Sequence, residues 1–152
     1  MTHSLISFLS ILSIFFICST GYKNNNVTAN NTRMTSNRLI IKIGSNTFNA
    51  TLSDNPTATG FKALLPLTVE MKELNGNEKY VDLPKNLPTA ASNPGTIQNG
   101  DLMLYGSSTL VLFYKTFSTT YNYSKLGRID DVTGLVAALG AGNIDVTFEA
   151  FD

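Results

Sequence analysis

The sequence predicts a mainly β domain, a closed or nearly closed antiparallel β-barrel whose ends are plugged by two short capping helices. Three observations lead to this fold class. Several runs alternate apolar and polar residues with a period of two, which marks strands buried on one face. Two short segments show helical spacing, and strands and helices do not alternate regularly along the chain, as a parallel sheet would require.

The chain divides into an export segment, a tether and one folded domain. Residues 1–22 contain no Asp, Glu, Lys or Arg, and their apolar run, 5–18, is shorter than the roughly 20 residues of a membrane span and typical of a signal peptide. Residues 23–37 are rich in Asn and Thr and bury too little apolar surface to offset their ordering entropy, which predicts a flexible tether. The folded domain is expected over 38–152.

The single cysteine, Cys18, ends the apolar run, at the position of the lipid-bearing cysteine of a bacterial lipoprotein. Lipidation of Cys18, cleavage near residues 20–22 and an uncleaved anchor are alternatives, and each predicts an exported protein. Such a protein would be secreted, periplasmic or lipid-anchored to the cell envelope, with membrane attachment through this segment as one outcome. The remaining alternative is that the first residue of the protein sequence is wrongly assigned.

The composition excludes several functional classes. Eleven Lys and Arg balance eleven Asp and Glu, so no net field attracts a polyanion, and we expect no nucleic-acid partner. The single His3 and Cys18 both precede the folded domain, which excludes a Ser/His/Asp triad, a Cys/His pair and a His-ligated metal there. Because the domain also lacks an EF-hand spacing or a carboxylate cluster, we expect no metal and no cofactor.

Strand signals set the order of the β elements. Residues 38–43 and 47–52, joined by Gly44-Ser45-Asn46, predict an opening hairpin with Phe48, Ala50 and Leu52 on its inner face. Period-two alternation predicts two further strands, buried on one face, at 67–72 and 144–150. Two more segments are apolar on both faces and predict central strands buried on both sides: 102–105 and 110–114.

Two short helices are predicted between the strands. The first begins at Pro56 behind Asp54 or Asn55 as its cap and ends before Pro66. The second begins at the adjacent acids Asp130 and Asp131, which we expect to cap it, and ends at Gly140. Its apolar face is predicted at the spacing i, i+3, i+4 and i+7: Val132, Leu135, Val136 and Leu139.

A set of ordered motifs runs through the domain: Asn55-Pro-Thr-Ala, Leu64-Leu-Pro-Leu67, Leu74-Asn-Gly-Asn-Glu-Lys-Tyr80, Asn93-Pro-Gly95, Gly100-Asp-Leu-Met-Leu104 and Leu126-Gly-Arg-Ile129. Together with the order of the elements, they resemble the cyclophilin barrel and, more specifically, the bacterial cyclophilin-like domain family. The resemblance spans roughly residues 38–151. It implies the same closed barrel that the alternation of apolar residues predicts.

The resemblance also bears on activity. Cyclophilins isomerise prolyl bonds with a hydrophobic proline pocket and an Arg from a Phe-His-Arg strand. The isomerisation itself needs neither a proton transfer by His nor a Cys nucleophile. The matching segment here, 77–81, contains no Arg, and the Gln-Phe-Phe strand of the enzymes is only loosely matched by 109–113. We therefore expect a barrel that binds an unknown peptide or small molecule without catalysis. A divergent peptidyl-prolyl isomerase is the alternative.

Candidate ligand contacts come from the aromatic residues of the domain. Phe117, Tyr121 and Tyr123 are predicted to line a groove at the barrel mouth with Tyr80 and Tyr105, because Tyr offers both apolar and polar surface. The alternative is that these are ordinary strand aromatics packing across a sheet.

Residues of two predicted strands are candidate ligand contacts through the resemblance to the enzymes. Glu78 and Tyr80 occupy the position nearest the catalytic strand, and Phe113 lies in the strand that matches Gln-Phe-Phe. The alternative for the first two is a hairpin at Asn75-Gly76 with solvated flanks. Phe113 is counted among the candidate ligand contacts.

Arg128 is the last candidate contact, in a predicted strand near the end of the chain. It is expected either to pair with Glu78 or Asp101 inside the barrel mouth or to bind a ligand carboxylate with its planar guanidinium.

Overall fold

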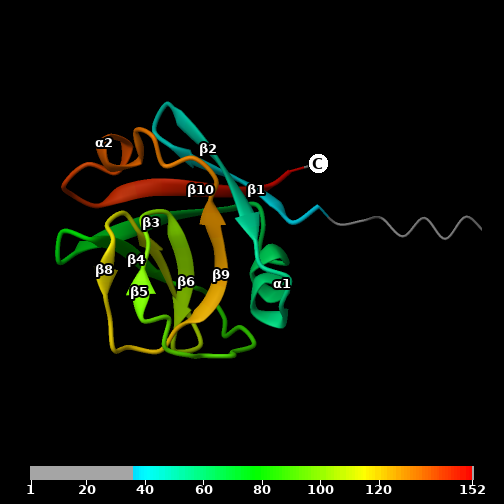
Figure 1. The fold of residues 1–152 in the computed structure, drawn as a ribbon. Coiled ribbons are helices and arrows are strands. Elements are labelled where there is room, and N and C mark those ends of the chain that lie inside the picture. The colour runs from blue at the N-terminus through cyan, green and yellow to red at the C-terminus, as the bar shows by residue number, and fades with distance from the viewer. Residues whose placement is uncertain (1–35, 152) are drawn as a thin grey trace, which may run out of the picture. The chain divides into compact units, whose positions relative to one another are not determined.

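The computed structural model describes residues 36–151, which contain ten strands: β1 (Arg38–Ile43), β2 (Asn46–Leu52), β3 (Leu67–Leu74), β4 (Glu78–Asp82), β5 (Thr96–Ile97), β6 (Asp101–Tyr105), β7 (Thr109–Phe113), β8 (Phe117–Ser118), β9 (Ser124–Ile129) and β10 (Ile144–Ala150). Eight of them form a closed antiparallel barrel in the order β1-β10-β3-β4-β7-β6-β9-β2 (Figure 1). Pairing of β2 with β1 closes the ring, and β5 and β8 form a separate two-stranded sheet. The predicted fold class is confirmed.

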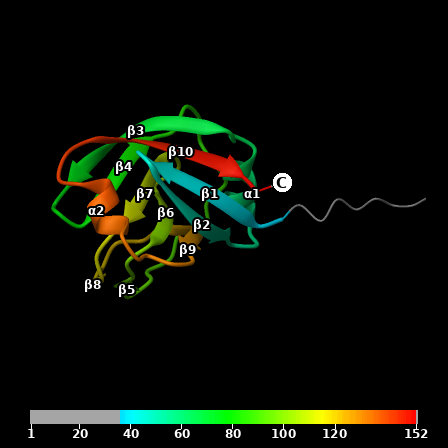
Figure 2. The same cartoon turned by 90° about the horizontal axis from the view of Figure 1, so that it is seen from above.

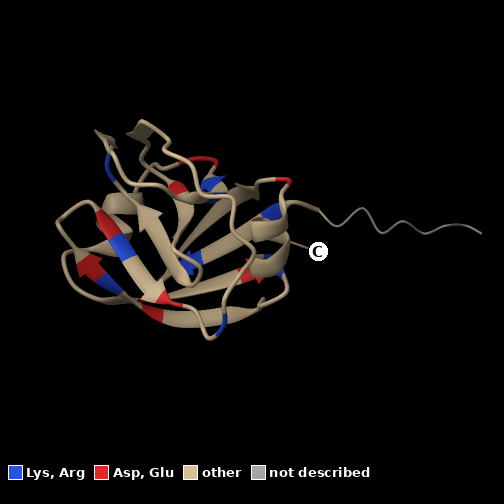
Figure 3. Cartoon of the chain, turned by 90° about the horizontal axis from the view of Figure 1, so that it is seen from below, with Lys and Arg blue, Asp and Glu red and all other residues tan. Residues whose placement is uncertain are grey.

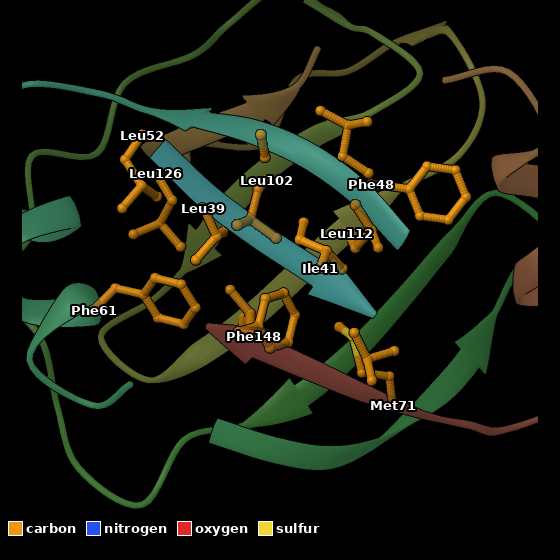
Figure 4. Close-up of a cluster of buried hydrophobic side chains, with 14 of the residues drawn as sticks. Leu39, Ile41, Phe48, Leu52, Phe61, Met71, Leu102, Leu112, Leu126 and Phe148 are labelled. Atoms are coloured by element: carbon orange, nitrogen blue, oxygen red, sulfur yellow. The ribbon is translucent and has the colours of Figure 1, made fainter. Parts of the chain in front are cut away.

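The barrel interior is filled by the inward-facing residues of the alternating strands. Phe48, Ala50 and Leu52 of the opening hairpin are buried, as predicted. Phe61 packs edge-on against Phe148 with ring centroids 5.6 Å apart. Figure 4 shows how side chains from distant strands converge on this core. Each fully buried Leu, Ile or Phe side chain contributes about 1.5–3 kcal/mol, so this core dominates the stability of the barrel.

The strands β6 and β7 are buried on both faces, as their apolar sequences predict. Alternate residues of β7, Leu110 and Leu112, face the barrel interior, whereas Val111 and Phe113 face outward. The outward residues join an outer cluster, which consists of Ile97, Met103, Val111, Phe113 and Tyr123. Ile97 belongs to β5, so the small β5–β8 sheet covers this part of the outer face.

The two helices lie at opposite ends of the barrel in both views (Figures 1 and 2). The first, α1 (Pro56–Lys62), begins with Pro56 and is capped by Asn55, whose Oδ1 accepts a hydrogen bond from the Ala58 amide at 2.8 Å. The second, α2 (Leu135–Leu139), buries Leu135 and Leu139 in the interior cluster. Helices therefore cap the barrel, as expected.

The predicted start of the second helix is wrong. It begins at Leu135, after Gly134 with a φ of 81°, and Val136 is 51% exposed although the helical spacing placed it on the apolar face. Asp131 accepts a hydrogen bond from the Thr133 amide in the preceding turn, and Asp130 accepts one from the Thr51 hydroxyl on β2. Because both carboxylates are used outside the helix, neither caps it.

Gly127, in the Leu126-Gly-Arg motif, allows two barrel strands to approach closely. A Cβ at this position would lie 2.5 Å from the Thr51 carbonyl oxygen and 3.0 Å from the Leu52 Cα. Since both contacts are with the β2 backbone, which a side-chain rotation cannot relieve, the β2–β9 pairing requires glycine at this position.

Charges of both signs are interspersed over the strands visible in Figure 3. The predictions for 1–22 and 23–37, lipidation of Cys18 included, concern residues outside those that the structure describes. Over 36–151, none of the helices has the length and apolar character needed to cross a membrane.

Candidate ligand-binding groove

A groove of about 700 Å³ lies on the outer face of the barrel, over β4 and β7 and beside β8. The turn between β3 and β4 forms one border, and the loop after β8 forms the other. The floor is apolar and the borders carry amide and hydroxyl groups, as is usual for small-ligand sites. Its lining residues are Leu74, Asn75, Asn77, Glu78, Tyr80, Tyr105, Thr109, Val111, Phe117, Ser118, Thr119, Thr120, Tyr121 and Tyr123.

Five aromatic rings form a continuous series along the groove. Ring centroids are 6.2 Å apart between Tyr121 and Tyr105, 5.6 Å between Tyr105 and Tyr123, and 5.5 Å between Tyr123 and Phe113. Phe113 then contacts Phe117 at 5.7 Å. Phe113 is fully buried, whereas Tyr105 and Tyr121 are 47% and 61% exposed. The series therefore runs from a fixed floor to accessible rings at the edge.

The alternation of β4 separates its side chains between the groove and the barrel interior. Glu78 and Tyr80 face outward and line the groove, whereas Lys79 between them is fully buried. Asn75 and Gly76, with φ values of 56° and 67°, form the turn that returns the chain into β4. The predicted turn thus forms, and the residues on both sides of it line the groove.

Glu78 carries the only charge among the lining residues, and it is half-buried. Within residues 36–151, none of the ion pairs or side-chain hydrogen bonds includes its carboxylate. Burial, and secondarily the negative charge of Glu73, raise the pKa of Glu78 above its ordinary value of 4.5. The groove therefore holds an uncompensated acid.

Replacing Glu78 by Gln is expected to raise the free energy of unfolding by more at pH 7 than at pH 4. Because the folded state binds the Glu78 proton more tightly than the unfolded chain, the free energy of unfolding falls as pH rises from 4.5 through the raised pKa. Gln removes this loss. Urea unfolding of both proteins in the same buffers at pH 4 and pH 7 measures the difference, and a stability gain that is smaller at pH 7 than at pH 4 would contradict the prediction.

A polar cluster of Lys79, Glu73 and Tyr114 closes the α2 end of the barrel interior. The Lys79 ammonium donates to Glu73 Oε2 at 2.5 Å and to the carbonyls of Gly140 and Gly142 at 3.0 and 2.6 Å. The Tyr114 hydroxyl donates to Glu73 Oε1 at 2.7 Å. All three ammonium donors are satisfied, so this cluster joins the barrel wall to the loop after α2 and offers no free group for catalysis.

The same cluster explains two pKa shifts. Burial opposes ionisation of Glu73, but the hydrogen bonds from Lys79 and Tyr114 outweigh it and lower its pKa below 4.5. Burial and the bond to Glu73 raise the pKa of Tyr114 to about 12. Sequence reasoning missed this cluster, although the period-two alternation of β4 already places Lys79 opposite to Glu78 and Tyr80.

Arg128 lies apart from the groove. It is on the outer surface of β9, where its Nε is 3.8 Å from Asp101 Oδ1 and its side chain is 51% exposed. One guanidinium nitrogen also donates to the Asn99 carbonyl at 3.4 Å. The expected pairing with Asp101 forms, but on the surface rather than inside the barrel mouth, because the neighbours Gly127 and Ile129 take the buried positions.

The structure brings most of the other candidate residues together: Glu78, Tyr80, Tyr105, Phe117 and Tyr121 line the groove. The groove lies on the outer face of the barrel rather than at its mouth, because Tyr80 and Phe117 pack against the outer cluster and not against the barrel interior. Phe113 lies beneath it as a buried support and does not line it. The hydroxyl border at Ser118, Thr119 and Thr120 belongs to the hydroxyl-rich segment 115–122 that the sequence places beside the groove, although only its aromatic residues were named as contacts. Over residues 36–151, no group of three or more His, Cys, Asp or Glu side chains could hold a metal ion.

These features define a closed antiparallel barrel with capping helices and an external aromatic groove. The model of the Cyclophilin-like family matches residues 41–149, and the chain belongs to this family, as the sequence motifs predict. The solution structure of the hypothetical protein AF2241 from Archaeoglobus fulgidus has a similar fold, with a TM-score of 0.52 and 18% identity over 80% of this chain and 99% of that one. No curated protein matches the chain.

Proposed function

We propose that this protein is a non-catalytic cyclophilin-like barrel that binds a peptide or a small organic ligand in the aromatic groove. The observation that carries this proposal is the open space of about 700 Å³ above the ring series, which the protein's own Tyr side chains do not fill. This volume lies within the range of about 300–1,000 Å³ that is usual for ligand sites. The accessible rings of Tyr105 and Tyr121 supply contact area at its edge.

The absence of an arginine from the groove lining favours binding over prolyl isomerisation. The segment that matches the catalytic strand of the isomerases presents Glu78 and Tyr80 to the groove, and Arg38 and Arg128 are not among the lining residues. Amide rotation has a barrier of about 18–20 kcal/mol, and a carboxylate cannot donate the hydrogen bond that Arg provides to the amide. We therefore infer that the groove retains recognition without this catalysis.

A ligand screen against the 152-residue chain, read by nuclear magnetic resonance, tests the proposal. Proline-containing peptides and small aromatic compounds are expected to shift groove resonances. Tyr121→Ala should weaken binding, while Phe151→Ala, at an exposed aromatic outside the groove lining, should leave it unchanged. A proline-peptide isomerisation assay separates the two functions: acceleration that is lost on changing Tyr80 would identify a divergent isomerase instead.

We also propose that the protein is exported. The support is the uncharged, apolar segment 1–22 with Cys18 at the end of its apolar run, followed by a polar tether. In this interpretation the groove faces ligands outside the cytoplasm.

A further inference from the structure

The charge inside the groove points to the chemistry of its ligand. Glu78 is half-buried and shares the groove lining with Tyr80 and Tyr105, and burying a carboxylate without a partner costs free energy. Two lysines lie on neighbouring surface: Lys72 is opposite Tyr80 in the β3–β4 pairing, and Lys115 is close to the turn at Gly76. Both are exposed, and neither forms an ion pair with Glu78. No cation within 36–151 therefore neutralises this acid.

The surroundings of Glu78 add further groups that attract a cation. Tyrosine rings attract cations through the negative charge on their faces, and Tyr80, Tyr105 and Tyr121 all line the same groove as Glu78. A protonated amine has donors and no acceptor, so it matches a site that combines a carboxylate with aromatic faces.

We propose that the groove selects a ligand that carries a protonated alkylamine or a guanidinium group, whose positive charge pairs with Glu78 against the tyrosine rings. This rests on the proposed function, because it names the ligand chemistry of the same groove. A ligand carboxylate is disfavoured there by repulsion from Glu78. The cation has two possible sources, a Lys or Arg side chain of a peptide and a free amine.

Titrations of the 152-residue chain, followed by nuclear magnetic resonance at low salt, test the proposal with three probes. These are a capped Ala-Ala-Lys-Ala-Ala peptide, the same peptide with Nε-acetyllysine, and n-butylamine. The lysine peptide is expected to bind about tenfold more tightly than its neutral acetyl form, since an ion pair and a cation–π contact are lost together. Resonances of Glu78, Tyr80 and Tyr105 should shift.

Two variants assign this preference to the groove. Glu78→Gln should reduce the tenfold preference to about twofold or less, whereas the matched Glu70→Gln, at an exposed carboxylate on β3 outside the groove lining, should retain it. Tyr121→Leu, at a ring that is 61% exposed, should weaken the lysine peptide about threefold without disturbing the core. The dispersion of the spectra reports whether each variant is folded.

The outcomes separate this inference from the proposed function. Equal binding of the charged and neutral peptides in the groove, or a preference that survives Glu78→Gln, would overturn the inference and leave ligand binding intact. No shift of groove resonances with any of these three probes would overturn the inference alone, because proline-containing peptides and small aromatic compounds test the proposed function separately. Both remaining outcomes support the proposal: n-butylamine binding as tightly as the lysine peptide would assign the cation to a free amine, and weaker binding would assign it to a peptide.

Discussion

Replacing Lys79 by Met is expected to lower the free energy of unfolding by about 3 kcal/mol, at the lower end of the range for breaking a buried ion pair. The ammonium is fully buried, and its loss leaves Glu73 Oε2 and the carbonyls of Gly140 and Gly142 without this donor, while Glu73 Oε1 keeps the bond from Tyr114. Glu73 is 22% exposed, so water can solvate it in part and reduce the cost.

Urea unfolding measured by circular dichroism tests this expectation. Lys72→Met, at an exposed cation on the adjacent strand β3, is the matched control and should change stability by no more than about 0.5 kcal/mol. The double variant Glu73→Gln with Lys79→Met should be less destabilised than the sum of the two single changes, because the two groups interact directly. A loss below about 1 kcal/mol for Lys79→Met would show that the cluster is not required.

Replacing Phe113 by Ala is expected to cost about 3–5 kcal/mol and to impair the groove at the same time. Phe113 is fully buried in the outer cluster and supports the rings of Phe117 and Tyr123. The cavity left by its ring removes the floor against which these side chains are fixed.

Unfolding and ligand titration of the same sample test both effects of this substitution. Phe151→Ala is the control, because that ring is 44% exposed, and it should cost less than about 1 kcal/mol and leave binding unchanged. If Phe113→Ala retained wild-type affinity for a groove ligand, the ring series would not depend on its buried member.

One strand, β4, carries both the buried cation of the polar cluster and the charged residue of the groove. On β4, Lys79 faces inward and is neutralised by Glu73, whereas its neighbour Glu78 faces outward and has no partner within the described residues. A shift of one residue in register would exchange the two environments, because successive side chains point to opposite faces. The paired charge holds the barrel end together, and the unpaired one is available to a ligand.

Local sequence patterns determined most of the fold. Alternation of apolar and polar residues predicts the opening hairpin, and continuous apolar runs predict that β6 and β7 are buried on both faces. Asn55 and Pro56 predict the start of α1, because a cap acts on amides only a few residues away. The aromatic content of the groove was predictable too, since its rings come from a short segment and from strands with readable faces.

Only the tertiary structure decided which polar groups are already in use. Asp130 does not cap α2 because it bonds to Thr51, 79 positions away in the chain, and Lys79 is satisfied by carbonyls 61 and 63 positions away. Arg128 meets Asp101 on the outer surface through the β6–β9 pairing. The sequence by itself therefore determined the barrel and its aromatic inventory, which depend on local periodicity. The open groove and its unpaired Glu78 depend on long-range contacts that only the folded chain brings together.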